Sequence, residues 1–249
     1  LIKYLLITKE IKMPGRLRSE LEGIPLHLIQ KGVNRLSFFY TDDDFNTYLY
    51  FLKSASKQEL VAIHSYVLMS NHVHLLVTPE CKGGVARMMS RLARDYTDYF
   101  NFKYYRSGDL FNPRMQSCLI DADNYLLSSQ RYIELNPVHA GLVKHPLQYS
   151  WSSYGVNAHG DESELITAHG VYEALGVSKP DRYRSYRSLF KDQLTPTLVK
   201  EISEHLHGEY CLGSDSFKKR IEAMLGRQVV RGNPVGSEIK VQLRSLCLE

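Results

Sequence analysis

Two apolar runs rich in β-branched residues, residues 61–68 and 72–77, follow each other closely in the first half of the chain. Only Met69-Ser70-Asn71 separates them, and this spacing predicts an antiparallel β-hairpin. The second run carries two histidines in an otherwise hydrophobic strand. The remaining predicted elements lie before and after this hairpin in the chain.

The segments on either side of the hairpin alternate between strand and helix patterns. The predicted elements are, in order, a strand over 26–33, a helix over about 41–57, the hairpin, a helix over 85–103, a strand over 115–120 and a helix from Asp121 or Asp123 to Pro137. The first six elements match the split βαβ, ferredoxin-like arrangement. We therefore expect an α+β fold, with an antiparallel sheet that has its helices on one face.

The composition of the chain changes after residue 154. Residues 155–164 are small and polar, and we expect a linker or a long loop there. The remainder is helical in pattern, and its amphipathic stretches 198–207 and 216–225 form either a DNA-reading helix pair or a packing appendage with a solvated basic face. The expected parts are an N-terminal extension (1–12), a main domain that starts at Met13 (13–154), the linker (155–164) and a helical C-terminal region (165–249).

Composition narrows the class of protein. Hydrophobic residues make up 43% and charged residues 23% of the chain, as in ordinary globular proteins. No apolar run approaches the ~20 residues that cross a bilayer, so we expect no membrane partner. A net charge of +4 permits a nucleic-acid partner and equally a mildly basic enzyme. The four scattered cysteines are typical of reduced thiols in a cytoplasm.

The two histidines of the hairpin carry the strongest chemical signal. Because side chains alternate along a strand, His72 and His74 project from one face and Val73 from the other. Two imidazoles on one face make half of a metal site, although an isolated pair of this kind is usually a polar pair on a solvated face. The apolar residues on both sides favour the metal site.

A second pattern places a tyrosine and an asparagine four residues apart. On a helix, Tyr132 and Asn136 share a face. The amide oxygen of Asn136 suits Mg²⁺ or Mn²⁺, and two histidines plus this oxygen would leave positions open for a phosphate oxygen. Tyr132 would then be a covalent nucleophile on a metal-polarised phosphate. The alternative is that Tyr132 is one packing tyrosine among 17 and Asn136 a helix-terminal residue before Pro137.

These residues, in this order, resemble a known family. Segments 68–76 and 131–143 are similar to those of the REP-associated tyrosine transposases, a group of the HUH nucleases, which are named for two histidines around a hydrophobic residue. Further segments that fit the group are 32–35, 106–111 and 151–154. The resemblance covers roughly residues 13–154. One departure is Val33, where the family commonly has a polar residue.

The resemblance implies a substrate and a reaction. Tyr132 would form a 5′-phosphotyrosine with single-stranded hairpin DNA and leave a free 3′-hydroxyl. His72 and His74 would bind Mg²⁺ or Mn²⁺, and Asn136 matches the position of the third ligand. A second 3′-hydroxyl would reverse the reaction and join DNA without ATP. We expect a monomer or homodimer in the cytoplasm, associated with the nucleoid.

Binding of DNA requires cationic side chains. The candidates are Arg16, Arg18, Lys31, Arg35, Arg87, Arg91, Arg94 and Arg114. The first four lie near the start of the chain, and Arg114 lies near the fourth strand. The three between 87 and 94 have helical spacing and mark either a DNA-binding surface or a solvated face.

The sequence therefore favours a metal-dependent transposase or endonuclease that cleaves and rejoins hairpin DNA. One alternative is a domesticated, catalytically silent regulator that binds DNA or RNA with the same fold. A second is a metal phosphohydrolase whose nucleophile is water. Only the transposase forms a covalent bond between tyrosine and DNA.

Overall fold

The computed structural model describes residues 20–226 and 228–229, and the candidate DNA contacts Arg16 and Arg18 lie outside the described residues. Four strands form one antiparallel sheet in the order β2-β3-β1-β4. They are β1 (Leu26–Lys31), β2 (Val61–Met69), β3 (His72–Pro79) and β4 (Gln116–Leu119). Met69 pairs with His72 across the turn, which confirms the predicted hairpin. The order of strands confirms the ferredoxin-like α+β fold.

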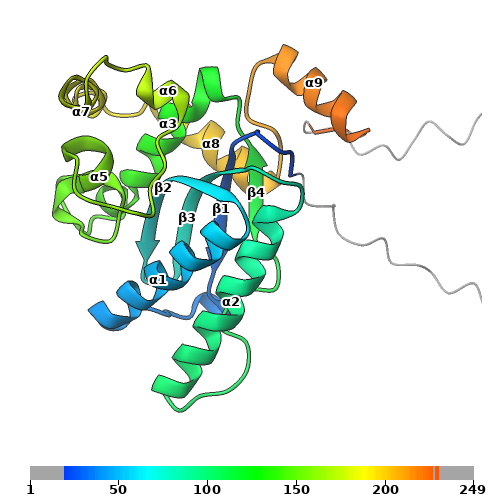
Figure 1. The fold of residues 1–249 in the computed structure, drawn as a ribbon, viewed down its shortest axis with the longest axis vertical. Coiled ribbons are helices and arrows are strands. Elements are labelled where there is room, and N and C mark those ends of the chain that lie inside the picture. Colours follow the sequence, from blue (N-terminus) through cyan, green and yellow to red (C-terminus); the bar gives the residue numbers. More distant parts are fainter. Residues whose placement is uncertain (1–19, 227, 230–249) are drawn as a thin grey trace, which may run out of the picture.

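Helices cover both faces of this sheet (Figure 1). Helices α1 (Asp42–Gln58) and α2 (Gly84–Lys103) cover one face, where Leu26 and Leu28 of β1 point. Helices α3 (Ala122–Glu134) and α8 (Pro196–Gly208) cover the other, where Ile29 points. The prediction of helices on one face holds for α1 and α2 only. The second layer combines α3, which follows the six elements of the ferredoxin-like pattern, with α8 from the distant C-terminal region.

Two boundaries differ from the sequence predictions. Helix α3 ends at Glu134, and Pro137 lies inside a separate short helix, α4 (Asn136–His139), instead of closing α3. The expected linker contains helix α5 (Tyr154–His159). The remaining elements are the 3₁₀ turns η1 (Val33–Arg35) and η2 (Pro146–Gln148) and the helices α6 (Gly170–Glu173), α7 (Lys179–Ser188) and α9 (Asp215–Leu225).

The C-terminal region packs against the main domain instead of standing apart. Helices α5, α6 and α7 gather beside the β2 end of the sheet, and α9 lies on the opposite side (Figure 1). Ile202 and Leu206 of α8 are fully buried against the sheet, and Phe217 of α9 joins the core on the α1–α2 side. Within the described residues, no helix combines the length and hydrophobicity that a bilayer crossing requires.

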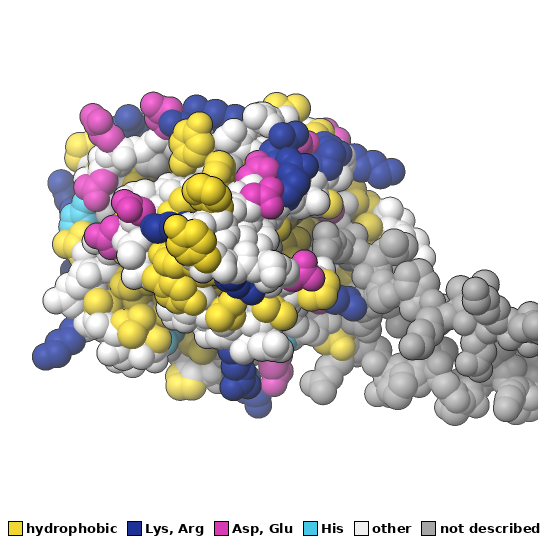
Figure 2. Space-filling view, turned by 90° about the horizontal axis from the view of Figure 1, so that it is seen from below, with side chains coloured by type: hydrophobic (Ala, Val, Ile, Leu, Met, Phe, Trp, Pro, Cys, Tyr) yellow, Lys and Arg dark blue, Asp and Glu magenta, His cyan; other side chains and the backbone are white. Residues whose placement is uncertain are grey.

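Exposed aromatic side chains gather where α1 begins and α2 ends. Viewed from below, the molecule shows hydrophobic side chains among basic and acidic ones (Figure 2). The exposed fraction of the residue is 53% for Tyr40, 86% for Phe102 and 98% for Tyr105. Tyr96 and Phe100, on the other side of α2, are fully buried. The two sides of α2 thus differ sharply, and its buried side faces the sheet.

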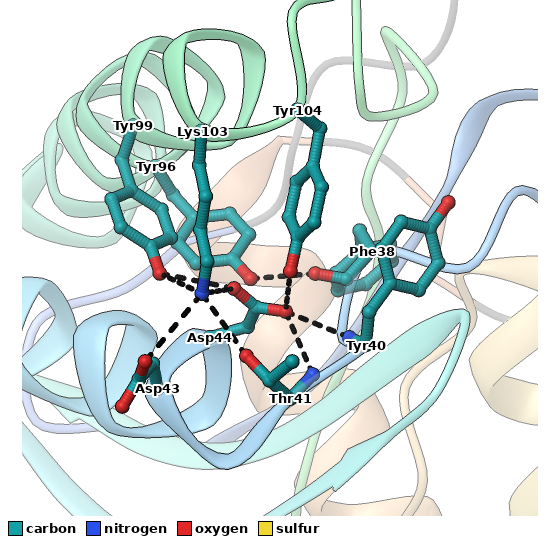
Figure 3. A network of polar contacts seen from close by, with 9 residues as sticks. All are labelled: Phe38, Tyr40, Thr41, Asp43, Asp44, Tyr96, Tyr99, Lys103 and Tyr104. Atoms are coloured by element: carbon teal, nitrogen blue, oxygen red, sulfur yellow. Dashed lines mark hydrogen bonds and ion pairs between the residues drawn. The ribbon is translucent and has the colours of Figure 1, made fainter.

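A buried carboxylate joins the start of α1 to the end of α2 (Figure 3). Asp44 accepts hydrogen bonds from the Lys103 ammonium group at 2.8 Å and the Tyr104 hydroxyl at 2.7 Å. It also accepts from the backbone amides of Tyr40 and Thr41, just before α1. Burial acts to raise the pKa of Asp44, but the hydrogen bonds from Lys103 and Tyr104 and the two amides outweigh burial and lower it to about 2.

We expect Asp44→Asn to lower the free energy of unfolding by about 3 kcal/mol, the cost of breaking a buried ion pair from one side. Urea denaturation measures this change. Because the folded pKa lies below the ordinary 3.8, the contribution is complete above that value and is lost as the pH falls through about 2. The control is Asp43→Asn, whose side chain is 83% exposed. Equal losses in both variants would contradict the role of Asp44.

A second buried carboxylate ties α3 to the rest of the molecule. The carboxylate of Glu134 accepts hydrogen bonds from Ser153 (2.6 Å), Asn157 (2.8 Å), Tyr186 (2.8 Å) and Ser65 (3.3 Å). Burial raises the pKa of Glu134, and these donors oppose the rise. The donors come from β2, from α5 and the residue before it, and from α7, so this one side chain fixes α3 against three elements.

Removing one of these donors should destabilise the protein. We expect Tyr186→Phe to lower the free energy of unfolding by about 1.5–3 kcal/mol, as for a hydrogen bond to a charged group. Tyr183→Phe is the matched control, because Tyr183 lies on the same helix and does not bond Glu134. Chemical denaturation of both variants provides the test, and a loss of stability confined to Tyr183→Phe would refute the anchoring role.

Candidate active site

The candidate catalytic residues lie on the face of the sheet that α3 and α8 cover. Val73 points into the α1–α2 core, so the neighbouring His72 and His74 point to the opposite face. The ring centroids of the two histidines are 5.2 Å apart. The ring of Tyr132, on α3, stands edge-on to His74 with centroids 6.0 Å apart. The fold therefore brings the tyrosine and the histidine pair together.

Both histidines are neutral near pH 7. Burial lowers the pKa of His72 to about 4, with a further contribution from the charge of Lys31, and burial holds the pKa of His74 well below its usual range. The Nδ1 of His72 lies 2.8 Å from the amide oxygen of Asn71, which only accepts hydrogen bonds. The proton of His72 therefore resides on Nδ1, and Nε2 keeps its lone pair for a metal ion.

A third histidine, which the sequence analysis did not identify, supports His74. His27 on β1 is fully buried, and its Nε2 lies 2.9 Å from Nδ1 of His74. If Nδ1 of His74 donates this hydrogen bond, Nε2 of His74 is free to bind a metal ion. The contact follows from the register of the strands. Ile29 pairs with His74, so His27, two residues before Ile29, is a diagonal neighbour of His74 on the same face.

Asn136 lines the same pocket, but it belongs to a different helix from the one predicted. It begins α4 instead of continuing α3, yet its amide nitrogen donates to the backbone carbonyl of Tyr132 at 2.9 Å. Among the described residues its amide oxygen accepts no hydrogen bond. The oxygen is thus available as a ligand, close to Tyr132.

The donor atoms of the pocket fit a divalent cation with open positions. No three His, Cys, Asp or Glu side chains converge on one point within the part of the chain that the structure describes. His72, His74 and Asn136 all line one cavity, and the candidate ligands are Nε2 of each histidine and the amide oxygen of Asn136. Neutral imidazoles and an amide oxygen suit Mn²⁺ or Mg²⁺ and would leave room for phosphate oxygens.

The pocket is a cavity of about 370 Å³ with basic residues at its edge. Its lining residues include Lys31 and Arg35, two of the predicted DNA contacts. Gly32 permits this arrangement, because a Cβ there would collide with the carbonyl oxygen of Leu36 as the chain turns back. Arg35 itself has a φ of 61°, which is uncommon for a residue other than glycine.

The other described DNA-contact candidates lie outside this pocket. Arg87 and Arg91 belong to α2, on the opposite face of the sheet, and both pair with Glu59. Arg94 of the same helix pairs with Asp95. The guanidinium group of Arg114 pairs with Glu209 beside an adjoining cleft. As contacts with DNA, these four residues stay predictions.

Solved structures offer three comparisons. The REP-associated tyrosine transposase bound to a REP hairpin is 19% identical, covers 64% of this chain and 93% of its own, and has a TM-score of 0.49. A protein from Deinococcus radiodurans described as a transposase is 21% identical over 48% of this chain and 95% of its own, with a TM-score of 0.35. A bacterial tRNA(His) guanylyltransferase-like protein in complex with GTP is 14% identical over 52% of this chain and 72% of its own, with a TM-score of 0.34.

The family described as "Transposase IS200 like" matches residues 21–136. No curated protein matches the chain. The matched segment contains the whole sheet, both histidines and Tyr132, and it ends at Asn136. This segment of the chain, residues 21–136, is therefore similar to the IS200-like transposases.

Proposed function

We propose that this chain is a metal-dependent, single-stranded DNA transposase that cleaves and rejoins hairpin DNA through a 5′-phosphotyrosine. The observation that carries the proposal is the placement of Tyr132 against His72 and His74 in one cavity with basic residues at its edge. The similarity of residues 21–136 to the IS200-like transposases supports a transposase. The resemblance of the sequence to the REP-associated group supports hairpin DNA as the substrate.

In the first step, the hydroxyl oxygen of Tyr132 attacks the scissile phosphorus. The bond from tyrosine to phosphorus forms while the bond from phosphorus to the 3′-oxygen breaks, and the 3′-oxygen gains a proton as the phenol loses one. Burial raises the pKa of Tyr132, whereas the neighbouring Ser203 hydroxyl lowers it. The phenol is thus protonated at rest and must lose its proton during the attack. A second 3′-hydroxyl reverses the step and joins the strands.

The surrounding residues prepare the phosphate and the ligands. Asn71 bonds Nδ1 of His72, and His27 lies against Nδ1 of His74, so each imidazole would keep Nε2 for a ligand when its Nδ1 carries the proton. A Mg²⁺ or Mn²⁺ ion bound there with Asn136 would polarise the scissile phosphate as a Lewis acid. Lys31 would neutralise a phosphate of the bound strand at the edge of the cavity.

We expect Tyr132→Phe to abolish the covalent adduct with DNA while binding of the hairpin stays nearly unchanged. The assay uses a 3′-labelled DNA hairpin with single-stranded flanks, Mn²⁺ and a denaturing gel. Tyr125→Phe is the control, because Tyr125 lies on the same helix with its hydroxyl bonded to Glu201 at 3.0 Å. An undiminished adduct in Tyr132→Phe would refute the proposal.

The same gel separates the two alternatives. A catalytically silent regulator binds the hairpin but leaves it intact. A phosphohydrolase releases cleaved DNA with no adduct, because water is its nucleophile. Either result with the unaltered protein would replace the transposase proposal.

A separate prediction concerns the metal ion. We expect His72→Ala to abolish Mn²⁺ binding in calorimetry, and His27→Phe to weaken it by about tenfold to a hundredfold, as for the loss of a residue that supports a ligand. His139→Ala, an exposed histidine on α4, serves as the control. The chelator EDTA should stop cleavage, and full activity in EDTA would count against the metal site.

A further inference from the structure

Helix α8 lies outside the family segment, yet its last turn borders the catalytic cavity. His207 lines this cavity together with Tyr132 and His72. Its Nε2 lies 3.2 Å from the Nζ of Lys31, which belongs to β1. Residues from two distant parts of the chain therefore meet at the edge of the proposed active site.

The hydrogen bonds of His207 show which atom donates. Its Nδ1 lies 2.7 Å from the backbone carbonyl oxygen of Ser203, which only accepts. The Lys31 ammonium group has donors only, so Nε2 of His207 is the acceptor of that contact and Nδ1 carries the ring proton. The lysine is thus oriented by a neutral partner that leaves its positive charge uncancelled.

This neutral pairing differs from the pairing of the basic candidates outside the cavity. Arg87 and Arg114 each pair with a glutamate, which offsets their charge. Lys31 has an imidazole in the corresponding role. A cation held in this way remains available for an anion, because an approaching phosphate does not have to displace a carboxylate.

Several contacts attach α8, and with it His207, to β4, α3 and the sheet. The side chain of Gln116 on β4 donates to the backbone carbonyl of His207 at 3.2 Å. Tyr125 of α3 bonds Glu201 at 3.0 Å, and Ile202 and Leu206 are buried against the sheet. The carbonyl end of α8 also lies beside Lys31, where a helix favours a positive charge. The helix is therefore built to place His207 at this point.

The lysine–histidine pair stands where two hollows meet. Lys31 and His207 line both the catalytic cavity and an adjoining cleft of about 680 Å³. Asn112 borders both as well. A strand whose scissile phosphate faces Tyr132 would pass this junction as it leaves the cavity.

We propose that Lys31 and His207 form a subsite for a DNA phosphate that neighbours the scissile one, and that His207 is the positioning residue for the Lys31 ammonium group. That this phosphate belongs to the DNA strand that Tyr132 cleaves rests on the proposed function. The subsite itself would make α8 part of the DNA-binding machinery, although α8 lies beyond residues 21–136.

The test measures binding of a fluorescein-labelled DNA hairpin with a single-stranded flank at several salt concentrations in EDTA. Phosphate contacts bind any sequence, so the natural hairpin is not needed. We expect Lys31→Met to reduce the slope of log Kd against log salt by about 0.7, the value for one phosphate contact with a single strand. His207→Ala should reduce the slope in the same direction.

Further variants separate positioning from folding. His207→Gln keeps an acceptor and should restore the slope. The slope of the double variant, Lys31→Met with His207→Ala, should be reduced no more than that of Lys31→Met alone. His205→Ala is the matched control. His205 lies on the same helix, and its Nδ1 is bonded to the backbone carbonyl oxygen of Glu201, one turn earlier in that helix. An unchanged slope in Lys31→Met, or an equal change in His205→Ala and His207→Ala, would overturn the subsite.

This experiment fails or succeeds independently of the adduct assay. Because EDTA prevents metal-dependent cleavage, the slope reports binding alone. A protein that shows the expected slopes but forms no adduct retains the subsite and refutes the transposase proposal. An adduct together with an unchanged slope in Lys31→Met refutes the subsite and retains the transposase.

Discussion

The carboxylate of Glu134 holds the tyrosine helix in place through hydrogen bonds from four side chains. A buried charge is costly unless it is fully hydrogen-bonded, so these donors and Glu134 depend on one another. Ser153 and Asn157 belong to a segment that contributes nothing to the cavity, yet they determine how α3 lies against β2. Residues 151–154 thus contribute one of the donors, Ser153, to the helix that carries the tyrosine.

Burial also gives the histidine pair its chemistry. On sequence alone, His72 and His74 could have been a polar pair on a solvated face. The structure excludes that alternative, because β3 is a central strand and His74 is only 2% exposed under α3 and α8. The same burial keeps the imidazoles neutral, which is the state a metal ligand requires. One layer of helices therefore both shields the site and sets its protonation.

The sequence predicts what depends on neighbours along the chain, and misses what depends on packing. Strand alternation places His72 and His74 on one face, and acidic residues at 42–44 mark the start of α1. The role of Asn157 could not be predicted, because the groups to which its buried amide donates, Glu134 and the backbone carbonyl of His64, lie far away in sequence. The roles of His207 and His27 could not be predicted for the same reason, because their partners, Lys31 and His74, lie on other elements.

The alternation of β3 also has a consequence for how this protein can change. Val73 and Leu75 belong to the main core, and His72 and His74 to the site, on one strand that bonds neighbours on both sides. Inserting or deleting a single residue would exchange the two sets, sending the imidazoles into the core and the aliphatic side chains into the cavity. The site therefore cannot drift along the strand in small steps. It is inherited together with the folded sheet, and decay of function has to proceed by substitution of individual side chains.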